Sequence, residues 1–160
     1  MIMTFEDLDA WKTARDLVNA VYAITRETAL RNDFGLCAQI QRAAVSAMSN
    51  VAEGFERQHF AEKIQAYNVA RASCGEVRSL LYVIENNYPR SAAAATEARK
   101  LVGEAGSLIS GLLASTRRRL AAKAGSGAGL IPLLAWIGVH FFGLKPVTNI
   151  RDCHLLAAIF

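Results

Sequence analysis

The chain contains three prolines, and their positions permit long helices. They stand at Pro89, Pro132 and Pro146. Proline ends or kinks a helix because it lacks the backbone N–H and clashes with the preceding turn. Uninterrupted helices are therefore allowed over residues 4–88 and again over 91–122, where Ala, Leu and Val dominate. The sequence predicts an all-α protein.

The first of these two stretches divides into helices by its capping and turn residues. Thr4 followed by Asp7 resembles a capping box and opens a first helix, which we expect to end near Thr28. Turn residues at 32–35 separate it from a second helix, and Gly54 is a plausible terminator or kink. A third helix is expected over residues 61–85, because two asparagines and Pro89 follow it.

A fourth helix is expected from Ser91, a good N-cap residue, to about residue 122. Its apolar residues follow the spacing of a helix bundle. The predicted buried seam consists of Ala94, Ala98, Leu101, Ala105, Leu108 and Leu112, with Val102, Ile109 and Leu113 beside it. Gly103, Gly106 and Gly111 each disfavour a helix by about 1 kcal/mol relative to Ala, so they indicate close helix approach at these points.

Short connections favour antiparallel packing of neighbouring helices. The predicted fold is an up-down-up-down antiparallel four-helix bundle with a C-terminal extension. The bundle is expected over residues 1–123, and a Gly/Ser linker with an apolar tail over residues 124–160.

A stripe of polar residues follows one face of the second helix. Amide, hydroxyl and carboxylate groups recur there at three- and four-residue spacing and could form a ladder of hydrogen bonds. We interpret the stripe as a seam between helices or between subunits, and a solvated helix face is the alternative. The proposed interface or structural residues are Arg42, Ser46, Ser49, Asn50, Glu53 and Gly54.

Basic residues suggest a second kind of surface. The formal net charge is +4, which allows a polyanionic partner without requiring one. Lys63, Tyr67, Arg71 and Arg78 share one side of the third helix, and an arginine cluster ends the fourth. The alternatives are a solvated basic face and, for the cluster, compensation of the helix dipole. The candidate nucleic-acid-binding residues are Lys63, Arg71, Arg78, Arg99, Lys100, Arg117, Arg118 and Arg119.

The chain carries no familiar catalytic or metal-binding motif. Nucleophile, metalloprotease and nucleotide-binding patterns are all missing from the sequence. Glu56 and His59 give the Glu-x-x-His spacing of di-metal bundles once, whereas such a site needs it twice. We therefore expect a protein that is not an enzyme and has neither a metal nor another cofactor.

The cysteines and the termini bear on location. Cys37, Cys74 and Cys153 are an odd number without paired spacing, which favours a reducing compartment, and no signal peptide is visible. We expect a cytoplasmic protein. Residues 124–144 contain no Asp, Glu, Lys or Arg, but Gly, Ser, Pro132 and His140 interrupt the apolar run. A loosely packed extension is favoured there over a membrane span.

Three segments resemble a known family. They read FEDLDAWKTARDLVNAVYAIT, FGLCAQIQRAAVSAMSNVAEGF and AYNVARASCGEVRSLL. The chain resembles, from Phe5 to about Leu120, the four-helix bundle proteins encoded in intervening sequences of bacterial large-subunit ribosomal RNA genes. The residues that match the family pattern are Phe34, Gly35, Leu36, Arg42, Ala43, Ser46, Asn50, Ala52, Glu53, Gly54, Ala70, Ser73 and Glu76.

This resemblance implies a role and partners. Relatives include the accessory protein of diversity-generating retroelements, a basic pentameric barrel that works with a reverse transcriptase and its template RNA. The leading hypothesis is therefore a homo-oligomer, implied to be a pentamer, that binds RNA or DNA nonspecifically. A protein-interaction scaffold and a tail-anchored membrane protein are the alternatives.

Overall fold

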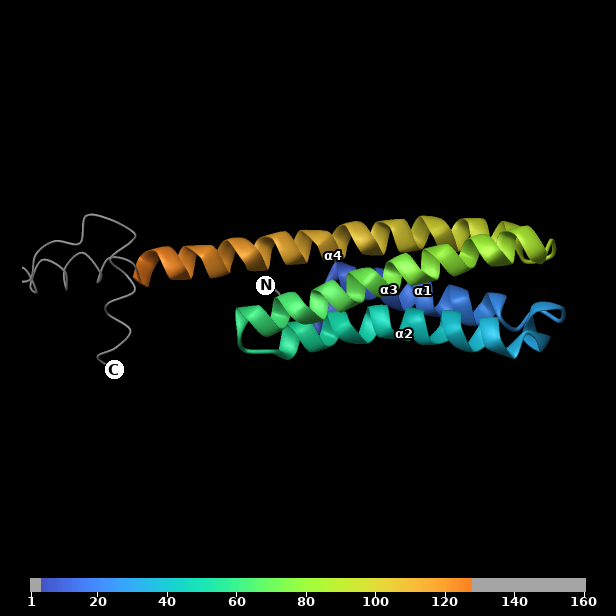
Figure 1. The fold of residues 1–160 in the computed structure, drawn as a ribbon, viewed down its shortest axis with the longest axis horizontal. Helices are drawn as coiled ribbons and strands as arrows, with labels where there is room; N and C mark the ends of the chain where they lie inside the picture. The colour runs from blue at the N-terminus through green and yellow to red at the C-terminus, as the bar shows by residue number, and fades with distance from the viewer. Residues whose placement is uncertain (1–3, 128–160) are drawn as a thin grey trace, which may run out of the picture. The chain divides into compact units, whose positions relative to one another are not determined.

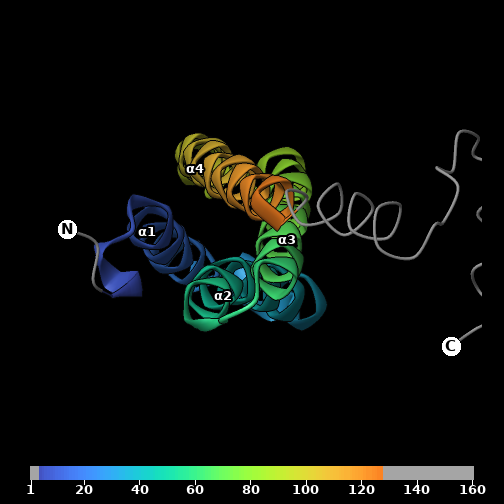
Figure 2. The ribbon, with the colours of Figure 1, turned by 90° about the vertical axis from the view of Figure 1, so that its left-hand side faces the viewer.

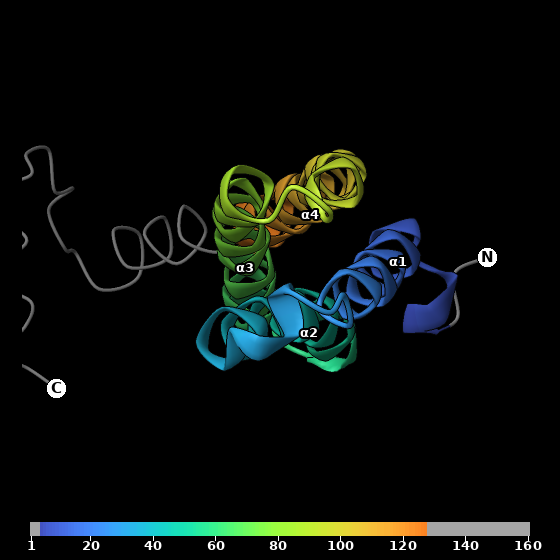
Figure 3. The same ribbon diagram turned by 90° about the vertical axis from the view of Figure 1, so that its right-hand side faces the viewer.

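The structure, a computed structural model, describes residues 4–127 and confirms the all-α prediction (Figure 1). The described elements are two 3-10 helices, η1 (Phe5–Asp7) and η2 (Leu30–Asn32), and four α-helices, α1 (Asp9–Ile24), α2 (Phe34–Glu56), α3 (Phe60–Asn87) and α4 (Ala92–Gly127). Seen end-on, the α-helices surround one core, and helices consecutive in the chain are neighbours (Figures 2 and 3). The fold is a four-helix bundle.

The chain divides into two compact units. The bundle belongs to the unit Met1–Leu120, and the last turns of α4 belong to Ala121–Phe160. The sequence predicted a flexible run from Ala124, but α4 continues as a helix to Gly127. The rest of the predicted apolar tail lies outside the described residues. Within residues 4–127, no helix has an apolar run long enough to cross a membrane.

The predicted capping box at the start of the chain is present. The backbone N–H of Thr4 donates to Asp7 Oδ2 at 3.0 Å, which opens η1 one turn before α1 begins. The predicted end of the first helix at Thr28 is wrong, because α1 stops at Ile24. Just after it, the Thr25 hydroxyl donates to Tyr22 O at 3.2 Å and accepts from Gln41 Nε2 at 2.7 Å. The Thr25 hydroxyl therefore links the end of α1 to α2.

Asp33 connects the beginning of α2 to the end of α3. Its Oδ1 accepts from the Leu36 N–H at 3.0 Å, as an N-cap does, and its Oδ2 accepts from the Tyr88 hydroxyl at 2.8 Å. These two hydrogen bonds, the backbone one first, lower the pKa of Asp33. The turn residue predicted from the sequence is therefore also a contact between helices.

Gly54 does not end α2, contrary to the sequence prediction. The helix continues to Glu56, and Gly54 lies buried inside it. The ring of Tyr67, only 4% exposed, packs against its Cα. A Cβ at this position would lie 2.7 Å from Tyr67 Cδ1 and 3.0 Å from Cζ, closer than nonbonded carbons approach. Gly54 is therefore required for the close approach of α2 and α3.

The buried seam of α4 lies beside the predicted one. Ala94 is exposed, and Leu101, Leu108 and Leu112 are half-buried. These leucines line surface grooves beside residues of α1. Alanines, Val102, Ile109 and Leu113 are the buried residues instead. The observed seam consists of Ala95, Ala98, Val102, Ala105, Ile109 and Leu113.

Two further details of α4 differ from the prediction. Ser91 stands directly before the helix as expected, but its buried hydroxyl has no hydrogen-bond partner within the described residues. The predicted close approach of helices at the three glycines is confirmed for Gly106, where a Cβ would lie 4.0 Å from Cys74 Cβ. It is wrong for Gly103 and Gly111, where a Cβ would meet nothing within 4 Å. These two positions have open space beside the helix.

The contact between Gly54 and Tyr67 predicts the effect of adding one methyl group. Gly54→Ala gains helix propensity but forces a buried ring to move, so we expect the free energy of unfolding to fall by about 1–3 kcal/mol. Gly75→Ala is the matched control, since a Cβ there meets nothing within 4 Å, and it should raise stability by up to about 1 kcal/mol. Urea unfolding followed by circular dichroism measures both. A Gly54→Ala protein as stable as Gly75→Ala would contradict the assignment.

Candidate nucleic-acid interface

The polar stripe of α2 forms hydrogen bonds with α3 of the same chain. The hydroxyls of Ser46 and Ser73 lie 2.9 Å apart. Asn50 Nδ2 donates to Ser46 O at 2.9 Å and contacts Ser46 Oγ at 3.3 Å. Nearer the start of α2, Gln39 Nε2 donates to Glu76 Oε1 at 3.2 Å. The contacts of Ser46 and Gln39 join α2 to α3, as one of the two interpretations of the stripe expects, whereas both hydrogen bonds of Asn50 stay within α2.

The other members of the stripe do not bridge helices. Glu53 forms an ion pair with Arg57, the C-cap residue that follows α2. The Ser49 hydroxyl donates to Ser46 O of its own helix at 3.4 Å. Arg42 makes no hydrogen bond or ion pair with the described residues. Arg42 and Ser49 line a shallow groove of about 470 Å³ beside α1, together with the exposed side chains of Tyr22 and Val45.

Lys63 of α3 is directed to the end of α2. Its Nζ donates to Phe55 O at 2.6 Å and to Gly54 O at 3.2 Å. The last carbonyls of a helix have no partner within the helix, so this ammonium group caps α2. Burial lowers the pKa of Lys63. The structure therefore places this predicted binding residue in a structural contact.

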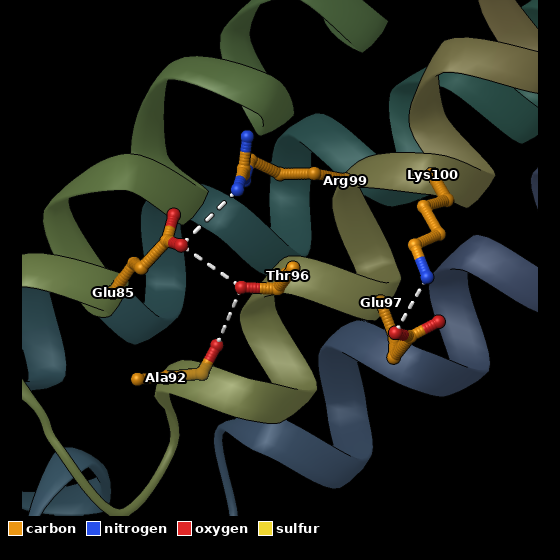
Figure 4. Close-up of polar contacts among 6 residues, drawn as sticks. All are labelled: Glu85, Ala92, Thr96, Glu97, Arg99 and Lys100. Atoms are coloured by element: carbon orange, nitrogen blue, oxygen red, sulfur yellow. Dashed lines mark hydrogen bonds and ion pairs between the residues drawn. The ribbon is translucent and has the colours of Figure 1, made fainter.

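Arg99 of α4 is held by α3 (Figure 4). Its Nη2 lies 3.1 Å from Glu85 Oε1, and each side chain is 25% exposed. The hydroxyl of Thr96 lies 2.8 Å from the same carboxylate oxygen and 3.1 Å from Ala92 O. The guanidinium carbon also lies 4.4 Å from the centroid of the Tyr82 ring. These contacts form a charged clamp between α3 and α4.

Lys100 follows Arg99 in the sequence but has a different environment. Its Nζ lies 2.7 Å from Glu97 Oε1 on the same helix, and both side chains are mostly exposed (Figure 4). An exposed pair of this kind contributes little to stability, typically about 0–1 kcal/mol. Its partner neutralises the lysine locally.

The remaining predicted residues are exposed arginines without partners. Arg71, Arg78 and residues 117–119 make no ion pair or hydrogen bond with the described part of the chain. Arg71 and Arg78 line a groove between α3 and α4. Arg119 lies near enough to Lys63 to contribute to lowering its pKa. Helical spacing places Arg117 within ~40° of the α4 residues Gly103 and Ser110, which line the same groove.

The predicted strip on α3 therefore has two different halves. Lys63 and Tyr67 pack against α2, whereas Arg71 and Arg78 are open to solvent. The sequence did not indicate that Glu85 pairs with Arg99. The two residues lie on different helices, so no short-range spacing signals the pair. The glycines of α4 that line the groove were visible in the sequence, but we interpreted them as points of close packing between helices.

These observations define a class of protein: a small helical bundle whose candidate interface is a set of exposed arginines that have no ion pair within residues 4–127. No group of three His, Cys, Asp or Glu among residues 4–127 is placed to hold a metal ion. The model of the family described as 23S rRNA-intervening sequence protein matches residues 6–111, and the chain belongs to this family. The family resemblance inferred from the sequence is confirmed. No curated protein matches the chain.

The different environments of Arg99 and Lys100 predict different effects of substitution. Arg99→Gln leaves Glu85 partly buried without its cationic partner, and we expect a loss of about 1–2 kcal/mol in the free energy of unfolding. Lys100→Gln, the neighbouring control, should change it by less than about 0.5 kcal/mol. Urea unfolding measures both variants. Equal stabilities would show that the clamp contributes nothing to the fold.

Proposed function

We propose that the protein is a non-enzymatic, homo-oligomeric bundle that binds RNA or DNA without sequence specificity. The observation that carries the proposal is a set of exposed arginines on α3 and α4 that have no acidic partner in the part of the chain that the structure describes, namely Arg71, Arg78, Arg117, Arg118 and Arg119. A guanidinium group presents a planar set of donors that matches the oxygens of a phosphate. Contacts to phosphate are the same for every base sequence.

Membership of the family supports a setting close to RNA. The family takes its name from intervening sequences of 23S ribosomal RNA. By resemblance to the retroelement accessory protein, the partner is a reverse transcriptase with its template RNA. A cytoplasmic location fits the buried, free thiols of Cys37 and Cys74.

Assembly would strengthen a weak basic surface. Two arginines on α3 give a modest field per chain, and several copies around an axis add their potentials. We assign the contact between subunits to the α1–α2 face, where Tyr22 and Val45 are exposed beside Arg42 and Ser49. The resemblance implies five subunits.

A scaffold that binds proteins is the second candidate. Phe34 at the start of α2 is 79% exposed, and an aromatic side chain of this kind is often a contact at a protein interface. On this hypothesis, the arginines only keep the protein in solution. Removing the arginines would then leave retention of nucleic acid unchanged.

The proposal predicts a salt dependence that specific arginines set. Affinity for a single-stranded oligonucleotide should fall steeply with salt, because each phosphate that the protein neutralises releases counterions. The double variant Arg71→Gln/Arg78→Gln should weaken binding and reduce the slope of log K against log salt by about 1.4, which is about 0.7 for each arginine that no longer neutralises a phosphate. Fluorescence anisotropy at several salt concentrations measures both quantities.

Arg26→Gln/Arg31→Gln is the charge-matched control. Both residues are exposed and lie in the connection between α1 and α2, so this variant removes the same charge elsewhere. It should keep most of the wild-type slope. If the two double variants behaved alike, general charge would account for the binding. If the wild-type protein bound neither RNA nor DNA at low salt, the proposed function would be rejected.

A further inference from the structure

A groove that carries two arginines lies between α3 and α4. Its volume is about 500 Å³, within the range of ligand-binding pockets. Arg71 and Arg78 stand on its α3 side, separated by two helical turns or about 10 Å along the axis. Gly103 and Ser107 stand on its α4 side.

The charges around the groove have one sign. No Asp or Glu is among its lining residues. Two acids stand next to lining glycines in the sequence, and neither lines the groove. Glu76 of α3 accepts a hydrogen bond from Gln39 of α2, and Glu104 follows Gly103 on α4. Glu85, further along α3, is paired with Arg99. The two guanidinium groups of Arg71 and Arg78 are therefore not neutralised by carboxylates of the described chain.

Glycines on both helices leave the groove free of side chains at two positions. A Cβ on Gly75 of α3 or on Gly103 of α4 would meet no atom within 4 Å. A ligand can therefore approach the helix backbones between the two arginines. The amide of Asn68 and the hydroxyl of Ser107 line the same groove and add neutral donors.

We propose that this groove binds the sugar–phosphate backbone of one nucleic-acid strand, with Arg71 and Arg78 each contacting a phosphate. This inference rests on the proposed function and names its substrate class. We expect this groove between two helices, with both arginines on its α3 side, to admit a single strand, whereas a duplex reaches only its rim. The lining contains no aromatic side chain on which a base could stack, so the contact is to the backbone and ignores sequence.

The preference for a single strand separates this site from a general basic surface. A duplex carries twice the phosphate charge per unit length of one strand, so a purely electrostatic surface favours the duplex. The groove predicts the opposite order. Competition between a labelled single-stranded oligonucleotide and its duplex of equal length, measured at low salt, tests this directly. Tighter binding of the duplex would overturn the inference.

Filling the groove without changing its charge is the second test. Gly103→Leu places a side chain in the groove while both arginines remain, and we expect the affinity for single-stranded RNA and for DNA of the same sequence to fall about tenfold. Gly111→Leu is the matched control on the same helix, because its Cβ position is equally open and it lies outside this groove. It should bind as the wild type does.

Gly75→Leu fills the groove from the other wall and should reproduce the weaker binding. Neither substitution meets an atom of the described chain at Cβ, and circular dichroism checks that both variants are folded. Binding by Gly103→Leu and Gly75→Leu that equals that of the control would overturn the groove while the proposed function stands. Weaker binding of only one of RNA and DNA would also overturn it, since the phosphate is common to both. If the wild type bound no nucleic acid, both proposals would fall.

Discussion

The close packing of α2 on α3 determines how the rest of the bundle is arranged. Gly54 has no side chain, and the buried ring of Tyr67 lies directly on its backbone. The same proximity allows the hydroxyls of Ser46 and Ser73 to meet at 2.9 Å. Together these contacts fix the rotation of α3 about its axis. That rotation decides which of its basic residues turn inward and which face solvent.

The basic residues consequently have two different roles. Lys63 caps α2 and Arg99 joins α4 to Glu85 of α3, so their charges stabilise the fold. Arg71 and Arg78 lie on the same side of α3 as Lys63, yet they have no acidic partner in the described chain. A charge that is paired within the fold holds the helices it joins, whereas an exposed, unpaired arginine is available to a phosphate. Whether a basic residue is available to a phosphate therefore depends more on its own pairing than on the net charge of the chain.

Much of the fold was predictable from local signals. The prolines, the capping box at Thr4 and the three- and four-residue spacing indicated four helices in the correct order. The errors arose where contacts between helices determine the end of a helix or its buried face. Gly54 has the local signature of a helix end, but only the position of Tyr67 shows why it is a glycine. Likewise, two adjacent apolar stripes run along α4, and the buried one depends on its distance from α1 and α3.

The basic residues of the candidate site were predictable from the sequence, but which of them are free to bind a phosphate was not. Sequence identified eight basic residues. The contacts of Lys63 with the end of α2 and of Arg99 with Glu85 join different helices and could not be inferred from spacing. The direct test of this selection is covalent footprinting with an arginine-selective dicarbonyl reagent, read by mass spectrometry with and without a bound single-stranded oligonucleotide. We expect Arg71 and Arg78 to react in the free protein and to be protected in the complex, while Arg99 reacts slowly in both. Unchanged reactivity of Arg71 and Arg78 in the complex would contradict their assignment as the phosphate-binding residues.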